Sequence, residues 1–552
     1  MNNLPQELVD HISSYLSHKD LKKTLLLSRK FQFAAEQFSE AFTDFALTLS
    51  NASKFISTYS GRRSYFLQNV SFATSVFSRE DEAEEDCRDT ANEVKLMDED
   101  FTFQIRFLFT TLKAVETRLN GVHSLVNIHL TIYTPTRAIN EERYCPHVKC
   151  ISWRVHLLSP STLPSLTSVR TLTVETPEQT FCGGEPVLSL RKPDLRMLLD
   201  ISSRLPYLGF LRCNIGGDEW QTGFRSEALR SATRDWEGPR RDSRHDFGKA
   251  LENLTVALPY LRHAQLDFLY PLNHVEGIDQ RLALPNLTKP AIYDPFSTSL
   301  RILSYQLRTM NLRVVADKTL FLPDDGSIPS WPNLESINVM FHMSTSSGSW
   351  FFNGLPGIGA TKGFDVTDKS YPSFKVNAKD YEEDDETADI NWDKERVTVQ
   401  YRVEPNEETL VPFLTAFATA AALMPLLKQA AIWSPLRFSP HTEGFNEYED
   451  FDTNQVSTLP CLGNAELAWG VAYTAPRLEA FKTLPGEHLS NNRQIWWRVA
   501  KWRPSPDLHH IFHCIGRDRH GKGLSEYWVD DYAGEGLNYR DNFESRRWYI
   551  NP

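Results

Sequence analysis

Cysteine is scarce in this chain, and its spacing argues against two common classes of protein. The 552 residues contain seven cysteines, an odd number, and no two of them form a C-x-x-C motif. The number and spacing of the cysteines are therefore not typical of a disulfide framework or of a four-cysteine zinc site. No charged segment followed by an apolar stretch precedes Leu4. From these features we expect a reduced protein that is cytoplasmic, nuclear or both.

Long hydrophobic runs and an excess of positive charge are also missing. A long run without a charged residue, Thr409 to Leu427, is rich in Ala and Thr and contains Pro412 and Pro425. This composition favours a buried helix over a membrane span, so the sequence predicts no membrane partner. Asp and Glu number 71 against 59 Lys and Arg, which gives a net charge of −12. The sequence therefore predicts no nucleic-acid partner either.

Motifs that carry catalysis are absent as well. The glycine-rich stretch 354–363 resembles a phosphate-binding loop, but Lys362 does not directly follow a glycine and no Ser or Thr comes after it. Neither a G-x-S-x-G nor an H-E-x-x-H motif occurs. The densest group of possible metal ligands is His509, His510, His513 and Cys514. This group lacks a second, distant pair of ligands, so we predict no metal site. His509 and His510 follow Pro506 and Leu508, which fit the proline pattern described below, and we interpret them as positions in a strand. We therefore predict a non-catalytic chain without metal or cofactor.

The sequence does contain an N-terminal stretch, residues 4–38, with the periodicity of three short helices. Apolar residues recur every four positions in the first of them, at Leu8, Ile12 and Leu16. Asp20 can cap a second helix and Ser28 a third. Helices this short bury too little apolar surface to be stable alone, so they need a partner inside or outside the chain.

This stretch resembles the F-box. The resemblance rests on residues at the offsets of that family, namely Leu4, Pro5, Glu7, Leu8, Ile12, Leu16, Asp20, Leu21, Leu25, Ser28, Arg29, Phe31, Ala34 and Ala35. It implies three helices that bind a Skp-type adaptor, which links them to a cullin–RING ubiquitin ligase. The adaptor-binding residues that it implies are Leu4, Pro5, Leu8, Ile12, Leu16, Leu21, Leu25 and Phe31. The alternative is an ordinary helical cap that packs on its own domain.

The rest of the chain carries an irregular pattern in which proline is followed by apolar residues two and five positions later. The instances begin at Pro146, Pro164, Pro206, Pro259, Pro332, Pro425, Pro476 and Pro506, with a partial copy at Pro285. Proline ends a helix, and alternating apolar residues after it are typical of a strand. The pattern resembles the degenerate leucine-rich repeats of many fungal F-box proteins. The predicted fold class is α/β, with a three-helix F-box followed by an irregular leucine-rich-repeat-like solenoid; the alternative is a non-repetitive α/β domain.

These patterns predict three regions: an F-box over 1–45, a helical and acidic linker over 46–110, and the repeat-like domain over 111–552. We expect a long insertion near 343–395, and solvated acidic runs within 79–100 and 380–386. Aromatic residues gather near the end, at Trp496, Trp497, Trp502, Tyr527, Trp528, Tyr532, Tyr539, Trp548 and Tyr549. We interpret them as a cap on the last repeat, with a recognition surface as the alternative.

The resemblance and the repeat together predict a role in protein recruitment. We expect the substrate-recognition subunit of an SCF-type (Skp–cullin–F-box) ubiquitin ligase, in which the F-box binds the Skp adaptor and the solenoid binds a target protein for degradation. Two alternatives stay open: a non-degradative F-box protein, and a solenoid scaffold without a ligase role. The sequence does not identify the protein substrate, because a repeat surface does not reveal what it binds.

Overall fold

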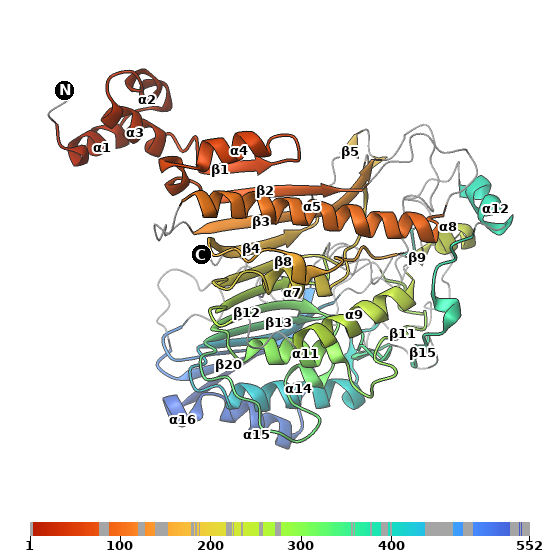
Figure 1. Ribbon diagram of the computed structural model, residues 1–552. Coiled ribbons are helices and arrows are strands. Elements are labelled where there is room, and N and C mark those ends of the chain that lie inside the picture. The colour runs from red at the N-terminus through yellow and green to blue at the C-terminus, as the bar shows by residue number, and fades with distance from the viewer. Residues whose placement is uncertain are drawn as a thin grey trace.

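The computed structural model describes residues 4–76, 88–119, 127–138, 153–177, 181–182, 185–186, 188–216, 223–224, 226–232, 234, 236–252, 258–270, 278–354, 357, 359–375, 378–387, 396–397, 400–436, 467–478, 490–529, 540 and 543. They form a mixed α/β structure with a small helical unit at the N-terminal end and one large sheet (Figure 1). The predicted α/β class is therefore confirmed.

Among the described residues, the large sheet has 13 strands and follows the order of the chain. Its strands are β1 (Asp44–Leu47), β2 (Asn69–Ser75), β3 (Ile128–Ala138), β4 (Val169–Glu175), β7 (Leu188–Leu190), β8 (Phe210–Asn214), β10 (His263–Asp267), β12 (Thr309–Val314), β13 (Ser336–Phe341), β18 (Gln429–Leu436), β19 (Leu467–Thr474), β20 (Arg493–Arg498) and β21 (Leu524–Val529). Apart from β7, which pairs antiparallel with β3, neighbours from β1 to β18 are parallel. The strand β19 runs antiparallel to both β18 and β20, and β21 is parallel to β20.

Helices cover one face of the sheet in the same order as the strands (Figure 1). They include α4 (Ala52–Tyr59), α5 (Ala91–Arg118), α7 (Arg196–Ser202), α9 (Glu237–Glu252), α11 (Pro295–Ser304), α14 (Glu407–Ala422) and α15 (Pro506–Cys514). A parallel pair of strands needs a crossover connection, and these helices supply it for pairs such as β2 with β3 and β10 with β12. The predicted buried helix in the uncharged run is confirmed as α14, whose apolar residues are buried although Pro412 lies within it.

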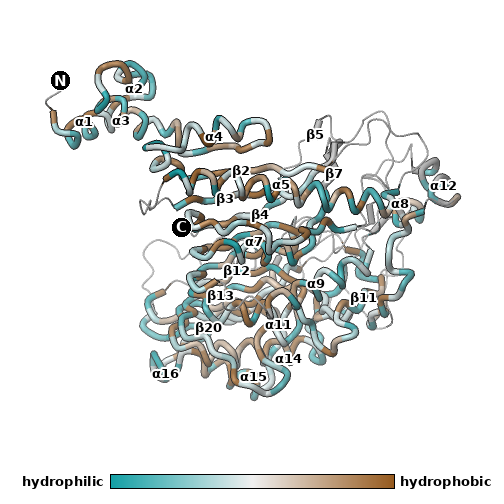
Figure 2. Tube along the Cα trace, viewed as in Figure 1, coloured by the Kyte–Doolittle hydropathy of each residue, from teal (hydrophilic) through white to brown (hydrophobic). Residues whose placement is uncertain are grey.

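One continuous hydrophobic core runs from Leu47 in β1 to Ile495 and Trp497 in β20. Figure 2 shows hydrophobic residues along the strands and on the helices that cover them. Because most strands of the sheet contribute residues to this core, the sheet and its helices form one structural body.

Equivalent leucines precede five neighbouring strands by two residues and are all buried. They are Leu208, Leu261, Leu307, Leu334 and Leu427. The first residues of β8, β10, β12, β13 and β18 are paired across the sheet, so these leucines occupy matching positions. In four of the five cases a proline of the sequence pattern stands two residues before the leucine: Pro206, Pro259, Pro332 and Pro425. The prediction that these prolines precede strands is confirmed.

The same prediction is wrong at Pro506, which begins the helix α15 rather than a strand. The reason is local, because Ser505 caps the helix by accepting a hydrogen bond from the backbone N–H of Leu508, and proline is well suited to the first helical position. His509 and His510 therefore lie in a helix, not in a strand. Pro285 begins only the two-residue strand β11 (Pro285–Asn286), outside the main sheet. Pro146 lies outside the described residues.

The two acidic runs are more ordered than expected. The run within 79–100 lies partly outside the described residues, but from Ala91 onward it forms α5, which starts with a capping box between Thr90 and Glu93. The second run forms α12 (Ala378–Thr387), and its Asp380 is buried. Asp380 accepts a hydrogen bond from Arg88 Nε at 2.8 Å. The expectation of an exposed loop is wrong from Ala91 onward, and the expectation of a solvated run is wrong at Asp380. The acidic residues 80–86 lie outside the described residues.

The predicted division of the chain remains a prediction, and several structural facts bear on it. The strands β1 and β2 fall in or next to the expected linker 46–110 and belong to the main sheet. Within the expected insertion 343–395, Trp350, Phe351 and Phe352 are buried in the main core. In the part of the chain that the structure describes, no helix is both long and apolar enough for a membrane crossing.

Candidate partner-binding surface

The three N-terminal helices project from the edge of the sheet that β1 forms (Figure 1). They are α1 (Gln6–Ser14), α2 (His18–Thr24) and α3 (Arg29–Phe38), and we call residues 4–38 the N-terminal unit. Ser28 caps α3 as predicted. The cap of α2 is Ser17 rather than Asp20, since Ser17 Oγ accepts a hydrogen bond from the backbone N–H of Asp20.

The N-terminal unit has a small core of its own. Val9, Phe31 and Ala34 are buried together, with Leu4 and Phe38 packed at the edge. Lys30 Nζ donates a hydrogen bond to the carbonyl oxygen of Leu4 at 2.6 Å. In α1 the side that faces this core carries Val9 and the buried Ser13, one helical turn apart. The apolar stripe predicted from the sequence therefore lies on a different side of α1 from the core.

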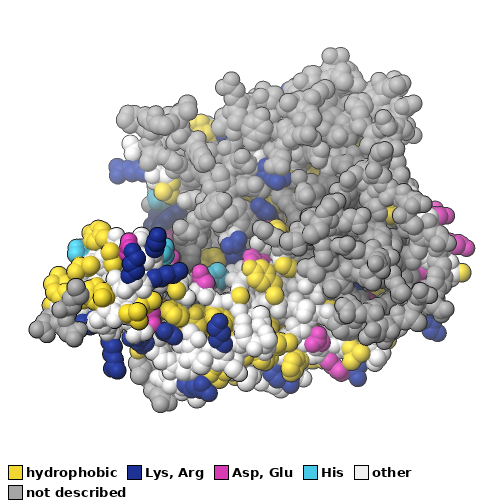
Figure 3. Space-filling view, turned by 90° about the horizontal axis from the view of Figure 1, so that it is seen from above, with side chains coloured by type: hydrophobic (Ala, Val, Ile, Leu, Met, Phe, Trp, Pro, Cys, Tyr) yellow, Lys and Arg dark blue, Asp and Glu magenta, His cyan; other side chains and the backbone are white. Residues whose placement is uncertain are grey.

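The N-terminal unit exposes six large apolar side chains, two of which belong to that stripe. They are Leu8, Ile12, Tyr15, Leu25, Leu26 and Leu27, and we call this set the leucine surface. Leu8 is 49% exposed, Ile12 44% and Leu26 95%. In Figure 3 hydrophobic side chains gather on the unit at the left, with Lys and Arg side chains among them. Exposed apolar side chains that lie close together mark sites of interaction with another molecule.

The structure separates the predicted adaptor-binding residues into three groups. Pro5, Leu8, Ile12 and Leu25 are exposed, Leu4 and Leu16 are partly buried, and Leu21 and Phe31 are buried. Leu21 and Phe31 therefore stabilise the unit itself in this conformation. Tyr15, Leu26 and Leu27 are exposed as well, although they are not among the residues predicted from the sequence. The signal for two of them was the run Leu25–Leu27 just before the cap Ser28, because consecutive leucines cannot all face one helical core.

A buried carboxylate fastens the unit to the body. Glu36 in α3 is only 3% exposed and lies 3.0 Å from Arg62 and 2.7 Å from Arg63, which belong to the short helix η1 (Arg62–Tyr65). Phe33 packs near Phe66, with ring centroids 5.3 Å apart. Burial raises the pKa of Glu36, but the hydrogen bonds and charges of Arg63 and Arg62 outweigh it and hold the pKa below its usual range. The ionised carboxylate thus holds α3 against the start of the sheet.

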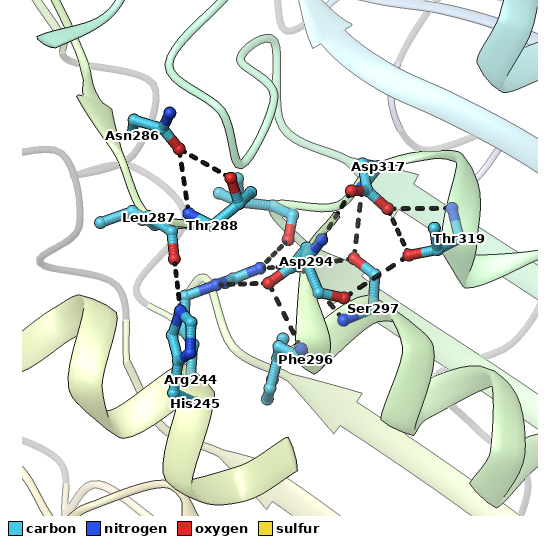
Figure 4. A network of polar contacts seen from close by, with 11 residues as sticks. Arg244, His245, Asn286, Leu287, Thr288, Asp294, Phe296, Ser297, Asp317 and Thr319 are labelled. Atoms are coloured by element: carbon cyan, nitrogen blue, oxygen red, sulfur yellow. Dashed lines mark hydrogen bonds and ion pairs between the residues drawn. The ribbon is translucent and has the colours of Figure 1, made fainter. Parts of the chain in front are cut away.

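A second group of titratable residues lies inside the body and has the character of a structural network (Figure 4). Asp294 caps α11 and accepts hydrogen bonds from Ser297 Oγ at 2.6 Å and from Arg244. Arg244 also donates to the carbonyl oxygen of Val315 at 2.8 Å. Asp317 accepts from the backbone N–H of Asp294 at 2.8 Å, and burial and the nearby Asp294 carboxylate raise its pKa. Because Asp294 is completely buried and bonded by the chain's own groups, it is placed to hold helices together rather than to meet a substrate.

Comparison with known proteins bears on the N-terminal unit alone. The family model of the F-box domain matches residues 1–40. A comparison of the chain with curated proteins found no match. The chain therefore carries an F-box domain over these residues, which confirms the resemblance seen in the sequence.

Proposed function

Starting from the F-box domain at residues 1–40, we propose that this chain is the substrate-recognition subunit of an SCF-type ubiquitin ligase. The N-terminal unit binds a Skp-type adaptor, and the sheet body holds a target protein. F-box proteins are generally non-catalytic adaptors, and their contribution is to hold a target close to the ubiquitin-transferring partners. The observation that carries the proposal is the leucine surface, which the chain leaves open to solvent.

The separation of two sides of α1 supports this assignment. An ordinary helical cap would bury Leu8 and Ile12 against the rest of its own domain, whereas both are nearly half exposed. The unit's own core uses Val9 instead. A partner that covers the leucine surface removes apolar area from water, and each square ångström contributes about 25 cal/mol.

The arrangement of the body supports the finer proposal that it is an irregular leucine-rich-repeat-like solenoid. Strands follow one another in chain order, and matching leucines precede β8 to β18. In a solenoid each unit buries its apolar side against its neighbours, and the resulting extended surface suits the binding of another protein. The body is therefore the part of the chain that we assign to the target.

The test compares two double substitutions in the full chain. Leu8→Asp with Ile12→Asp places charges in the leucine surface, and we expect it to abolish co-purification of the Skp-type adaptor. The matched control is Leu282→Asp with Ile328→Asp, since both residues are exposed in the body, Leu282 to 49% like Leu8. The control should keep the adaptor, and circular dichroism should show both variants folded. Adaptor binding that survives the first double substitution would refute the assignment.

A second measurement separates a ligase subunit from an F-box protein that acts outside the ligase. Cullin should co-purify with the adaptor, and ubiquitin should be transferred to proteins that the body binds. Adaptor binding without cullin or ubiquitin transfer would favour the non-degradative alternative.

A further inference from the structure

The helix α15 presents two histidines on a side next to its buried face. Leu508 and Phe512 point into the main core, whereas His509 and His513, four residues apart, share another side. His510 lies on the exposed part of the same helix. Ser505 and Pro506 fix where the helix begins, and therefore fix which residues face the core and which do not.

The strand β21 brings a carboxylate to these two histidines. His509 Nε2 lies 2.8 Å from Glu526 Oε2, and His513 Nε2 is in contact with Glu526 Oε1. The two Nε2 atoms lie 3.2 Å from each other. One ligand atom from each residue falls within 4.8 Å of the others, and among the described residues these three are the group with this property. All three side chains are partly exposed, so the site is open to solvent.

The contacts place two imidazole nitrogens and one carboxylate close to one another. Two protonated Nε2 atoms can each donate to a different oxygen of Glu526, which is the arrangement without a metal. A central cation can take the place of these protons, because each of the three residues can then direct a lone pair at it.

The spacing of the histidine nitrogens fits a particular class of cation. Two nitrogen ligands at about 2.0–2.1 Å from a tetrahedral zinc ion are about 3.3 Å apart, close to the distance between His509 Nε2 and His513 Nε2. Imidazole nitrogens with one carboxylate suit Zn²⁺ and related transition metals rather than Ca²⁺ or Mg²⁺, which prefer oxygen ligands alone. We propose that His509, His513 and Glu526 form a binding site for a divalent transition metal of the zinc type, with a fourth position left to water or another ligand.

The surroundings of Glu526 support the site in two ways. Trp497 Nε1 donates a hydrogen bond to Glu526 Oε2 at 3.1 Å and so orients the carboxylate, as outer partners do in metal sites. Trp497 also stacks on Trp528, with ring centroids 4.8 Å apart.

The metal joins α15 to β21, which pairs with β20 through the register Ile495 with Glu526. Its binding therefore fastens the last strand of the main sheet to a helix whose other side is in the core.

The experiment titrates the metal-free full chain with Zn²⁺ by calorimetry and with Co²⁺ by visible absorption. We expect one metal ion per chain, a Co²⁺ spectrum of the four-coordinate type, and a rise in the unfolding temperature with Zn²⁺. His509→Ala, His513→Ala and Glu526→Gln should each weaken Zn²⁺ binding by more than tenfold. Glu526→Gln keeps the shape of the side chain and an acceptor for Trp497, so it separates loss of a ligand from loss of folding.

The matched control is His510→Ala, which removes an exposed histidine from the same helix but not from the site. It should bind Zn²⁺ like the unchanged chain. Three results would overturn the proposal: no saturable binding, equal binding by Glu526→Gln and the unchanged chain, or an equal loss in His510→Ala. None of these measurements depends on adaptor binding, so the metal site and the proposed function fail or succeed separately.

Discussion

The body buries leucines such as Leu211 and Leu266 in one continuous core, whereas the N-terminal unit leaves Leu8, Leu26 and Leu27 in contact with water. The two regions also use ion pairs differently. The body encloses Arg244 and Asp294 completely, and the unit is joined to it by Glu36 with two arginines that are partly exposed. Leucines and ion pairs therefore stabilise the interior of the body. In the N-terminal unit, leucines form an exposed surface and an ion pair connects the unit to the body.

This difference has a physical reason. A unit with a core of a few side chains cannot bury all its apolar residues, so some must remain outside. Exposing them costs free energy unless another molecule covers them. The inner strands of the body have more neighbours, because a strand lies on each side of them and helices cover one face of the sheet (Figure 1).

The largest expected effect on stability comes from removing one partner of the buried ion pair between Arg244 and Asp294. Asp294→Ala leaves Arg244 buried without its carboxylate and removes the cap of α11. We expect the free energy of unfolding to fall by about 3–5 kcal/mol, measured by urea denaturation. Asp324→Ala is the control, since Asp324 is an exposed aspartate nearby, and it should change stability by less than about 0.5 kcal/mol. Equal effects of the two substitutions would contradict the structural role of the network.

A smaller and more local loss of stability is expected from changing Glu36, which joins the N-terminal unit to the body through Arg62 and Arg63. Glu36→Gln removes the charge that Arg62 and Arg63 share, and we expect a loss of about 1–2 kcal/mol, confined to the N-terminal unit. Hydrogen exchange of the amides in α1 to α3 measures it. Exchange that rises equally in the sheet would show that the two regions do not unfold separately.

The ion pairs of Glu36 with Arg62 and Arg63 also predict that the stability of the N-terminal unit depends on pH. The folded state holds the pKa of Glu36 below the ordinary value of 4.5. The stabilisation that the ionised Glu36 carboxylate gives to the folded state is therefore fully present above pH 4.5, and it is lost as the pH falls through the folded pKa. Protection of α3 amides, corrected for intrinsic exchange, should therefore fall with acid in the unchanged chain and less steeply in Glu36→Gln. Glu40→Gln, at an exposed glutamate just after α3, is the control and should behave like the unchanged chain.

The sequence predicts features that depend on neighbours along the chain. Pro332 and Leu334 precede β13 as expected, and Ser28 caps α3, because proline restricts the backbone and serine bonds a nearby N–H whatever lies around them. Pro506 misled the strand prediction because Ser505 and Asp507 beside it form the start of a helix. At this position the local signal for a helix outweighs the proline pattern.

Features that depend on distant residues could not be predicted in this way. Glu526 meets His509 only because β21 pairs with β20 and α15 packs against the same core, and no spacing in the sequence records that contact. The side of α1 that faces inward is likewise set by Phe31 and Ala34 of α3. The periodicity of α1 revealed one apolar stripe, but only the packing decides that Val9, outside the stripe, forms the core.

The smallest expected effect on stability gives the sharpest test of the contrast between the regions. Leu26 is 95% exposed, so Leu26→Ser should change the free energy of unfolding by less than about 0.5 kcal/mol. If the leucine surface is an interface, the same substitution should weaken adaptor binding by about 1 kcal/mol or more, roughly fivefold, measured by calorimetry. Ile292→Ser, at an exposed residue of the body, should alter neither quantity. A loss of stability without a loss of adaptor affinity would mean that Leu26 supports the fold of the unit, and the leucine surface would then need to be redrawn around Leu8 and Ile12.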